Sequence, residues 1–415
     1  MDFERSPRAR EMADRVGAFM DREVLPRHRE WTQAVVREGK AGAAFMPEVQ
    51  AKARAEGLWN LALPDLAANE PGTRLTNLEY AGCCELMGRL AWAPEAFNCQ
   101  APDVPNMITL HQCANPEQKR AWLAPLLEAK TRSAFGMTEP AVASSDATNI
   151  ACRIERQGGD YVINGRKWFS TGAAHPRCSQ LMVMGVTEDK GERTRRHSVV
   201  MVPMNAPGLR LVRELEWMGL RDHVAPIGEL ELVDVRVPVE NRLGAEGDGF
   251  KVAQVRLGPA RVHHCMRQIG LAGLMIDLML ARAAERSTFG RRVIEYDTVQ
   301  RWIAESRVEL EQAKLLTLKC AWLLDRQGHH GAWREVSLVK LAVPAMLQRV
   351  ADRAIQVFGA MGGTDDVPIH HALAYARLMR IGDGPDEVHL RQVFRQETPP
   401  PWTVAESPYV VPAPR

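Results

Sequence analysis

Acidic residues near the C-terminus are the first candidates for chemistry. The segment RIGDGPDEVHLR places Asp383, Asp386 and Glu387 around Pro385. Carboxylates can serve as general acids and bases in enzymes. Proline also fits the first turn of a helix, where acids oppose the positive helix end. By these local rules alone, Asp383 or Gly384 would be a helix cap.

Two segments rich in hydroxyl groups could hold a cofactor. FGMTEPAVASSD (135–146) combines small residues with hydroxyls, which suits an anion or the polar edge of a flat cofactor. WFSTG (168–172) offers an aromatic ring for one face of a planar ring system and hydroxyls for its edge. Each segment has a structural alternative. The first could be a linker with a turn at Glu139-Pro140, and the second could be a strand with one aromatic residue in the core. Taken singly, the structural alternatives are favoured.

Two helix ends carry further candidates. AERSTFG (284–290) contains Arg286, whose guanidinium fits a pyrophosphate. The same arginine would suit a helix C-terminus, with Gly290 as its cap. QVFGAMGGTDD (356–366) has three glycines that could admit a ligand or another backbone, although a plain C-cap and a turn explain one or two of them.

Motifs of several other site classes are missing from the sequence. No strand-following GxGxxG and no GxxxxGK[ST] occurs, so Rossmann and P-loop sites are unsupported. The eight cysteines are scattered without CxxC or Cys/His ligand spacing, so we expect no metal. No Ser-His-Asp or Cys-His set can be argued from sequence, and His263-His264 is interpreted as a helix-packing feature.

Composition narrows the class of protein. The 415 residues are 46% hydrophobic and 25% charged, as in soluble globular proteins of two or three domains. The net charge of +2 gives no reason to expect binding to nucleic acid or to a membrane surface. No run of 18 apolar residues occurs, and the first thirty residues resemble neither a signal nor a transit peptide. We therefore expect a cytoplasmic protein.

Three parts of the chain must position these segments, and together they predict a mostly α fold with a central β domain. Residues 1–132 are rich in helix-forming residues, with apolar positions spaced by three and four. Residues 133–243 contain short β-like runs that predict a barrel or sandwich. Residues 244–398 return to the helical period and predict a four-helix bundle. The proline-rich tail 399–415 is predicted to be extended.

Particular turns and helices within these parts can also be predicted. Asn164-Gly165 between two β-like runs predicts a hairpin with a type I′ turn. In the C-terminal part, 334–358 and 385–396 are amphipathic and are predicted as the last two long helices.

Over residues 10–397 the chain resembles the acyl-CoA dehydrogenase family. Six motifs follow in family order with family-like spacing: MTEPxxxSSD, INGxKWFxTG, VRVPxxNxLGxxGxGF, RxTFG, QxxGxxG and IxDG. Each motif alone is weak, whereas six in register are specific. The helical half from LGPARVHHCMRQIG to DGPDEVH is most similar to a branch that in some organisms is fused to an aminoglycoside-phosphotransferase-like domain, a fusion not expected for this chain.

The resemblance implies a flavoprotein oxidoreductase of fatty acid oxidation. Family members have an N-terminal helical domain, a middle β domain and a C-terminal four-helix bundle, and they bind FAD and acyl-CoA. A carboxylate removes the α-proton of the thioester and the β-hydride goes to flavin N5, giving the 2-enoyl-CoA. Electrons then pass to an electron-transfer flavoprotein. The flavin lies between subunits, which implies a homodimer or a homotetramer.

The same resemblance assigns roles to individual residues. Asp383 matches the base, and Arg261 and Gly384 match positions near the acyl-CoA. The residues matching positions beside the flavin are Phe135, Met137, Thr138, Ser144 or Ser145, Phe169, Ser170 and Thr171. The residues that match contacts to the FAD of a neighbouring subunit are Arg286, Phe289, Gln356 and Gly359. A short run after the base, which contacts FAD in the family, matches Pro385, Asp386 and Glu387.

Several positions depart from the family pattern. The common base position is a Glu-Gly pair, whereas here it is Asp383-Gly384. Some branches instead place a glutamate just before the arginine of the acyl site, where this chain has Ala260. The loop EPAVASSD is one residue longer than the commonest form, which leaves Ser144 and Ser145 as alternatives. Ala360 and Asp297 replace a usual glycine and glutamine of the intersubunit FAD contacts.

Two other functions remain open at this point. An enzyme of the same scaffold could use oxygen directly, as an acyl-CoA oxidase or a flavin monooxygenase. A protein with a degraded site could bind acyl-CoA or FAD without catalysis. Asp383 and the hydroxyl-rich segments argue against the second alternative, although the carboxylate is one methylene shorter than glutamate.

Overall fold

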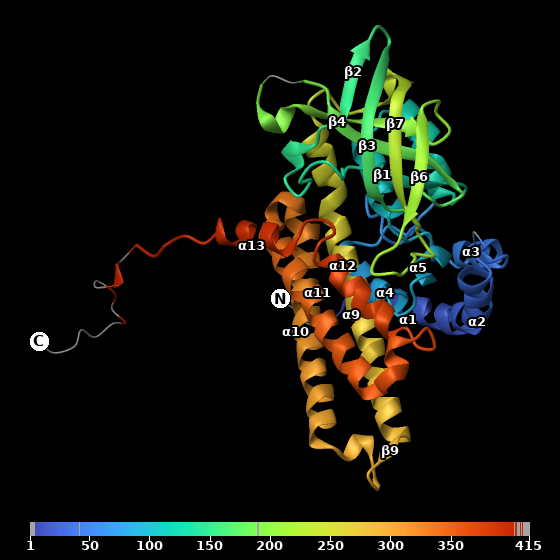
Figure 1. Ribbon diagram of the computed structural model, residues 1–415, viewed down its shortest axis with the longest axis vertical. Coiled ribbons are helices and arrows are strands. Elements are labelled where there is room, and N and C mark those ends of the chain that lie inside the picture. The colour runs from blue at the N-terminus through green and yellow to red at the C-terminus, as the bar shows by residue number, and fades with distance from the viewer. Residues whose placement is uncertain are drawn as a thin grey trace, which may run out of the picture.

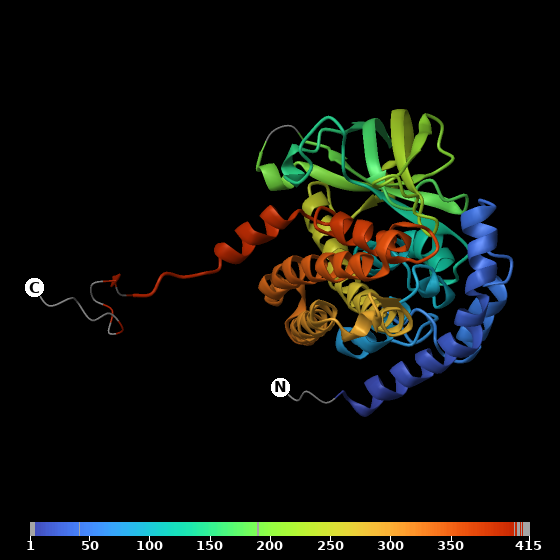
Figure 2. The same cartoon turned by 60° about the horizontal axis from the view of Figure 1, so that its bottom comes forward.

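The computed structural model describes residues 5–40, 42–188, 191–401, 403–404, 407 and 409. A β domain lies at one end of a bundle of long helices, and shorter helices cover one side (Figure 1). Figure 2 shows the first helices running along that side of the molecule. None of the described helices combines the length and the apolar composition needed to span a bilayer.

Short helices with sequence-encoded starts form the N-terminal part. Ser6 caps the first helix by accepting a hydrogen bond from the Ala9 amide at 3.1 Å, with Pro7 at the first helical position. Thr76 and Glu79 form a capping box that starts α4. The helices are α1 (Pro7–Phe19), α2 (His28–Trp31), α3 (Met46–Ala55), α4 (Asn77–Met87), α5 (Ala93–Ala96), α6 (Asp103–Cys113), α7 (Pro116–Gln118) and α8 (Ala124–Leu127), with π-helical segments Met20–Val24, Thr32–Arg37 and Lys119–Leu123.

An eight-stranded sheet forms the middle part. Its strand order is β6-β7-β3-β2-β4-β5-β8, and β1 pairs with β4 in parallel. Alternating apolar side chains such as Ile163, Leu181 and Leu230 fill a core inside the sheet. The strands are β1 (Arg132–Gly136), β2 (Arg153–Gln157), β3 (Asp160–Ser170), β4 (Cys178–Val186), β5 (His197–Pro203), β6 (Leu209–Leu215), β7 (Ile227–Pro238) and β8 (Arg242–Leu243).

The predicted hairpin turn at Asn164-Gly165 is wrong. Both residues lie inside the continuous strand β3, and the turn falls instead between Gln157 and Asp160, which pair with each other. The Asn164 side chain bonds β7, because its Oδ1 accepts from the Asp234 amide at 2.8 Å. Gly165 is required by close approach, since a Cβ there would lie 2.8 Å from the Cys152 sulfur. Tertiary contacts therefore explain a dipeptide that reads locally as a turn.

Long helices form the C-terminal part, and one of them differs from the prediction. The apolar stripe that includes Ile269, Ile276 and Met279 is buried, as expected. The fourth bundle helix is α12, a segment that is not among the predicted helices although its buried residues follow helical spacing. The predicted helix 385–396 is the short α13, at the edge of the bundle (Figure 2). The elements are α9 (Gly249–Glu285), the hairpin β9 (Ser287–Thr288) and β10 (Arg291–Arg292), α10 (Asp297–Gly331), α11 (Trp333–Phe358), α12 (Ile369–Met379) and α13 (Asp386–Phe394).

The proline-rich tail is described only in part. Residues 399–401 are non-helical, as predicted. Positions 402, 405–406, 408 and 410–415 of the predicted extended segment lie outside the described residues.

Candidate functional site

Asp383 lies in the turn between α12 and α13, and cations from two other helices hold the backbone of this turn. Asp383 has a φ of +57° and Gly384 a φ of +107°, a region that glycine and, less often, aspartate adopt. Nε of Arg261 in α9 donates to the Asp383 carbonyl at 2.8 Å. Nζ of Lys340 in α11 donates to the Gly382 carbonyl at 2.8 Å and to a carbonyl in the last turn of α12. The bundle therefore fixes the position of Asp383.

The Asp383 carboxylate lies beside an imidazole and three cations. Its Oδ2 lies 3.7 Å from Nε2 of His264, and the side chain is 18% exposed. Burial would raise the pKa of Asp383, but His264 and three nearby cations outweigh it and lower the pKa below its ordinary value. The three cations are Lys340, Arg256 and Arg261. At neutral pH the group is a carboxylate, the form that can accept a proton.

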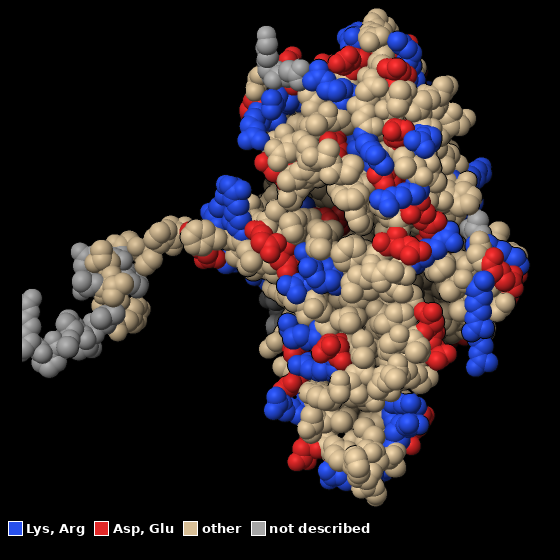
Figure 3. All heavy atoms as spheres, in the orientation of Figure 1, with Lys and Arg blue, Asp and Glu red and all other residues tan. Residues whose placement is uncertain are grey.

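Arg256 connects this charged group to the segment that follows β1. Its Cζ lies 4.5 Å from the centre of the Phe135 ring, and its Nε donates to Asn106 at 2.8 Å. Burial lowers the pKa of Arg256 to about 10, with Asp383 opposing the shift, so the guanidinium stays charged. Asp383, Arg261 and Phe135, which are far apart in the sequence, thus lie in one region. Figure 3 shows a hollow between the β domain and the helices beside this turn, with acidic and basic atoms inside it.

The hydroxyl-rich segment is a loop clamped against β3. Lys167, fully buried, donates to Glu139 at 2.7 Å and to the Met137 carbonyl at 3.0 Å. The Trp168 amide donates to the Thr138 carbonyl at 3.0 Å. Ser144 accepts from the Glu139 amide at 2.9 Å, so its hydroxyl closes the loop. These bonds place Met137 and Thr138 next to the strand that carries the aromatic segment.

The two residues that were alternatives in this loop differ in their surroundings. Ser144 is half-buried and bonded within the loop, whereas Ser145 is exposed. A hydroxyl already used to close the loop is less free to bond a ligand. We therefore favour Ser145 as the hydroxyl available to a cofactor, with Ser144 supporting the loop.

The aromatic segment ends β3 in a strained turn. Phe169 has a φ of +48°, and its ring lies 6.5 Å from that of Trp217. Trp217 donates to the Ala374 carbonyl of α12 at 2.8 Å. Positive φ is uncommon for a bulky aromatic and is found where the surrounding structure imposes it. This contact ties the end of β3 to the helix that leads to Asp383.

Polar atoms around β3 fit the edge of a flat cofactor such as the expected FAD. The Ser170 hydroxyl and the Trp168 indole N–H are buried without a partner among the described residues. The half-buried hydroxyls of Thr138 and Thr171 also make no hydrogen bond within that part of the chain. A ring system with carbonyl and nitrogen atoms on its edge can satisfy such donors, which buried polar groups require.

The four residues matched to a neighbouring subunit's FAD lie at the other end of the bundle. Arg286 and Phe289 are exposed beside the hairpin β9–β10, which is at the opposite end from the β domain (Figure 1). Gln356 and Gly359 are exposed at the end of α11. The end of α11 lies beside the end of α9 that leads into this hairpin, because the guanidinium of Arg282 in α9 is 5.4 Å from the ring of Phe358 in α11. One chain does not bring these residues to the Phe169 region.

Three residues at the start of α13 lie directly after Asp383. Pro385 is the helix cap, Asp386 accepts from Arg380 at 2.7 Å and Glu387 is exposed. The Asp386 pair helps close the turn, a structural role that the sequence did not indicate.

Sequence reasoning missed several members of the Asp383 group. His264 packs α9 against Tyr375 of α12, and His263 is buried against Tyr80, so both contact neighbouring helices as interpreted; the sequence did not indicate that His264 also lies beside Asp383. Arg261 and His264 are three residues apart on α9, a spacing that places them on one helix face and could have indicated the relation. Lys340 and Arg256 gave no comparable signal.

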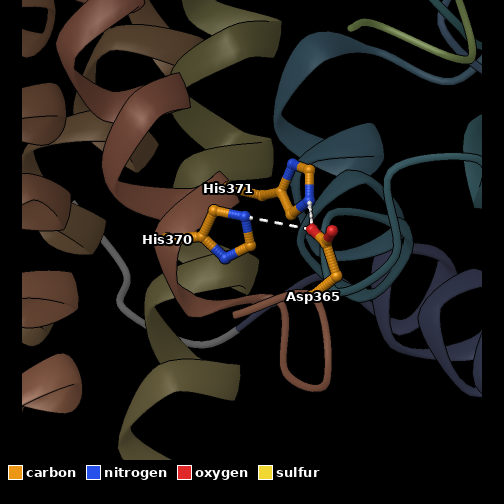
Figure 4. A group of neighbouring side chains, drawn as sticks. All are labelled: Asp365, His370 and His371. Carbon is orange, nitrogen blue, oxygen red and sulfur yellow. Dashed lines mark hydrogen bonds and ion pairs between the residues drawn. The ribbon is translucent and has the colours of Figure 1, made fainter. Parts of the chain in front are cut away.

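A second group of titratable side chains lies at the start of α12 (Figure 4). Oδ1 of Asp365 is 3.2 Å from Nε2 of both His370 and His371. The Nδ1 atom of His370 is buried without a partner among the described residues. A metal on Nε2 would leave a proton on this Nδ1 with no acceptor, whereas metal-bound histidines normally donate that proton. The contacts of the two rings with the Asp365 carboxylate account for the group without a metal.

Comparisons with known proteins agree with this architecture. Sequence models described as the N-terminal, middle and C-terminal domains of acyl-CoA dehydrogenase match residues 6–130, 134–235 and 247–397. The probable acyl-CoA dehydrogenase FadE2 of Mycobacterium tuberculosis is 46% identical over 96% of this chain and 97% of its own. Acyl-CoA dehydrogenase family member 11 of Gallus gallus is 45% identical over 95% of this chain. The chain spans about half the length (51%) of that relative.

A solved structure is similar over nearly the whole chain. It comes from Mycobacterium abscessus, and its assignment as an acyl-CoA dehydrogenase is itself provisional. The two proteins share 44% identity with a TM-score of 0.90, and the match covers 95% of this chain and 98% of the other.

Proposed function

Because the chain belongs to the acyl-CoA dehydrogenase family, whose cofactor is FAD, we propose that it oxidises an acyl-CoA thioester to the 2-enoyl-CoA. Asp383 takes the α-proton, and a double bond forms between Cα and Cβ. FAD, when bound, would supply the acceptor for the β-hydride. Atoms and electrons balance, because the substrate loses one proton to Asp383 and one hydride to the cofactor.

The observation that carries this proposal is the setting of Asp383. Its carboxylate is held ionised by cations of α9 and α11, and Arg256 joins this group to Phe135. The α-proton of a thioester is a weak acid, so its removal needs a positioned carboxylate in a site from which water is excluded. An acyl chain that displaces water from the 18% exposed Asp383 side chain would raise its basicity at the moment of reaction. The turn, whose backbone is held by Arg261 and Lys340, fixes the position of this carboxylate.

The cofactor site that we propose has two parts. Within one chain, Phe135, Met137, Thr138, Phe169 and the hydroxyls near β3 surround the flavin, with Pro385, Asp386 and Glu387 beside it. The second part comes from another copy of the chain, because its residues are exposed at the far end of the bundle. These residues are Arg286, Phe289, Gln356 and Gly359.

An assembly and two partners follow from the same proposal. A homodimer or homotetramer would bring the two parts of the cofactor site together. Acyl-CoA would lie near Arg261 and Gly384, and an electron-transfer flavoprotein would reoxidise the flavin. We also propose domain limits at 1–132, 133–243 and 244–398, followed by the tail 399–415.

The absorbance of the purified protein tests this function. We expect yellow protein whose flavin absorbance is lost when an acyl-CoA of suitable length is added without oxygen. A panel of straight, branched and long-chain acyl-CoA thioesters would identify the substrate. A protein that binds no flavin, or whose flavin no thioester reduces, would contradict the proposal. Rapid reoxidation in air after reduction would instead indicate an enzyme that uses oxygen directly.

A further inference from the structure

His264 connects Asp383 to a buried hydroxyl. The imidazole belongs to α9 and lies between the turn that carries Asp383 and α12. Its Nδ1 is 3.0 Å from the Tyr375 hydroxyl, and its Nε2 is 3.7 Å from Oδ2 of Asp383. Three elements thus contribute one group each to a continuous row: tyrosine hydroxyl, imidazole and carboxylate.

The protonation states in this row follow from burial. Burial raises the pKa of Tyr375, so its hydroxyl keeps its proton. Burial lowers the pKa of His264 to about 4, with Asp383 opposing the shift and Arg267, Lys340 and Arg256 adding to it. The imidazole is therefore neutral at pH 7 and carries one N–H.

The position of that single proton is set by the two neighbours of the ring. A proton on Nδ1 would turn the lone pair of Nε2 toward the negative carboxylate, which is unfavourable in a site of low dielectric. When the Tyr375 hydroxyl donates to Nδ1, the proton resides on Nε2 and faces Asp383. With the proton on Nε2, the Tyr375 hydroxyl, the His264 imidazole and the Asp383 carboxylate each face a suitable partner.

We propose that His264, held in this tautomer by Tyr375, is a positioning residue that orients the Asp383 carboxylate for proton abstraction. The inference rests on the proposed function, since it concerns the same base. It adds two residues that the family resemblance did not indicate.

Other bonds of the site fix the backbone rather than the carboxylate. Nε of Arg261 donates to the Asp383 carbonyl, and Lys340 donates to the Gly382 carbonyl. Nε of Arg256 donates to Asn106. These cations favour the ionised carboxylate, whereas these three hydrogen bonds end on other acceptors. An N–H on Nε2 of His264, which lies 3.7 Å from Oδ2, would be a donor to the carboxylate itself.

The distance of 3.7 Å is longer than a hydrogen bond. Catalytic hydrogen bonds are often long before the substrate binds and shorten in the complex. An aspartate is one methylene shorter than the glutamate common at this position in the family, so its carboxylate has less reach. A neighbouring donor that limits its rotation is correspondingly more important.

Two substitutions of His264 separate positioning from packing. His264→Leu keeps an apolar side chain in the site but removes the donor, whereas His264→Gln places an amide N–H near the position of Nε2. With FAD-loaded protein and a substrate acyl-CoA, we expect His264→Leu to slow flavin reduction roughly 10- to 100-fold, the range for a misplaced catalytic group. His264→Gln should recover most of the rate, and acyl-CoA affinity should change little in either variant.

The pH profile provides an independent readout. A hydrogen bond to the carboxylate favours its ionised form, so losing the bond should raise the pKa of Asp383. The acidic limb of the flavin-reduction rate should move to higher pH in His264→Leu and less in His264→Gln. Tyr375→Phe should cause a smaller shift in the same direction, because the ring remains but its tautomer is no longer fixed.

Each result either supports or overturns the proposal. A His264→Leu enzyme with the wild-type rate and an unmoved acidic limb would overturn it. If the leucine variant does not fold, His264→Gln should exceed His264→Asn in rate, since only glutamine reaches the Nε2 position, and equal rates would overturn the proposal. Asp383→Asn, measured in parallel, separates the role of His264 from the role of Asp383. If Asp383→Asn loses activity while the His264 variants keep theirs, only the positioning role of His264 is rejected. If Asp383→Asn remains active, the role of Asp383 as the base is rejected.

Discussion

The ionisation of Asp383 depends on side chains that are distant in sequence. Lys340 and Arg256 lie on α11 and α9, and both lower the pKa of the carboxylate against the effect of burial. By local rules Asp383 or Gly384 would cap the last helix, whereas the cap in the structure is Pro385. The cap rule also gives no reason for three cations around the acid, which the proposed role of Asp383 as a base would use.

The pH dependence of stability tests the burial of the neighbouring His263. Burial lowers the pKa of His263 to about 3, whereas an unfolded chain takes up this proton near pH 6.5. The unfolded state therefore binds more protons between these values, and stability falls as pH decreases through that range by about 1.4 kcal/mol per pH unit for one such group.

A substitution isolates this contribution. His263→Gln should flatten the fall in unfolding free energy between pH 6.5 and pH 3, measured by urea denaturation at several pH values. His330→Gln, at an exposed position, is the control and should leave the slope unchanged. An unchanged slope in His263→Gln would show that His263 does not remain neutral in the folded protein.

At the scale of elements, the loop after β1 is held by one buried ion pair. The Lys167 and Glu139 side chains are 0% and 5% exposed, and Lys167 also donates to the Met184 carbonyl at 2.7 Å. Glu139 accepts from the amides of Ala151 and Cys152. The pair therefore joins the loop to β3 and β4 and keeps Met137 and Thr138 in place.

Removing one partner of this pair should be costly. Lys167→Met leaves a buried carboxylate unpaired, so we expect a loss of about 3–5 kcal/mol in unfolding free energy and weaker FAD retention. The double variant Lys167→Met with Glu139→Gln should lose less than the sum of the two single variants. Arg301→Ala removes an exposed pair with Glu305 and should cost less than about 1 kcal/mol. Additive losses in the cycle would show that the pair does not act as a unit.

Sequence patterns predicted those elements whose periodicity is strong, and missed those that depend on contacts. The helical period beyond residue 244 and the short β-like runs within 133–243 are clear patterns, and helices and strands lie there. The hairpin at Asn164-Gly165 is wrong because β7 and Cys152 fix those residues within a strand. In the site, motif order indicated Asp383 and Arg261, but His264 and Lys340 could not be predicted, because their roles depend on how three helices pack.

At the scale of the whole molecule, one end of the bundle presents an unusual surface. Phe289 is 98% exposed and has a φ of +49° at the hairpin β9–β10. A fully exposed phenylalanine held in a strained backbone gains nothing within its own chain. A second copy of the chain that places its flavin there would explain both the phenylalanine and the nearby Arg286.

Loss of Arg286 tests this assembly. Arg286→Ala should reduce FAD retention and lower the melting temperature of the loaded protein, because a ligand bound only to the native state stabilises it. Arg292→Ala, which removes a different exposed arginine of the same hairpin, should retain FAD. Full FAD occupancy and unchanged melting in Arg286→Ala would indicate that the arginine is merely a cation at a helix end.

The rate of flavin reduction in Asp383→Asn tests the central claim most directly. Asparagine keeps the shape of aspartate and, like aspartate, tolerates the positive φ found at this position, so folding and FAD content should be preserved. We predict that reduction by the best acyl-CoA under anaerobic conditions slows roughly a hundredfold or more, the usual cost of removing a general base. Asp383→Glu, which restores the commoner family side chain, should keep measurable activity if the site tolerates the longer reach. An Asp383→Asn enzyme that contains FAD and is reduced at the wild-type rate would contradict the account.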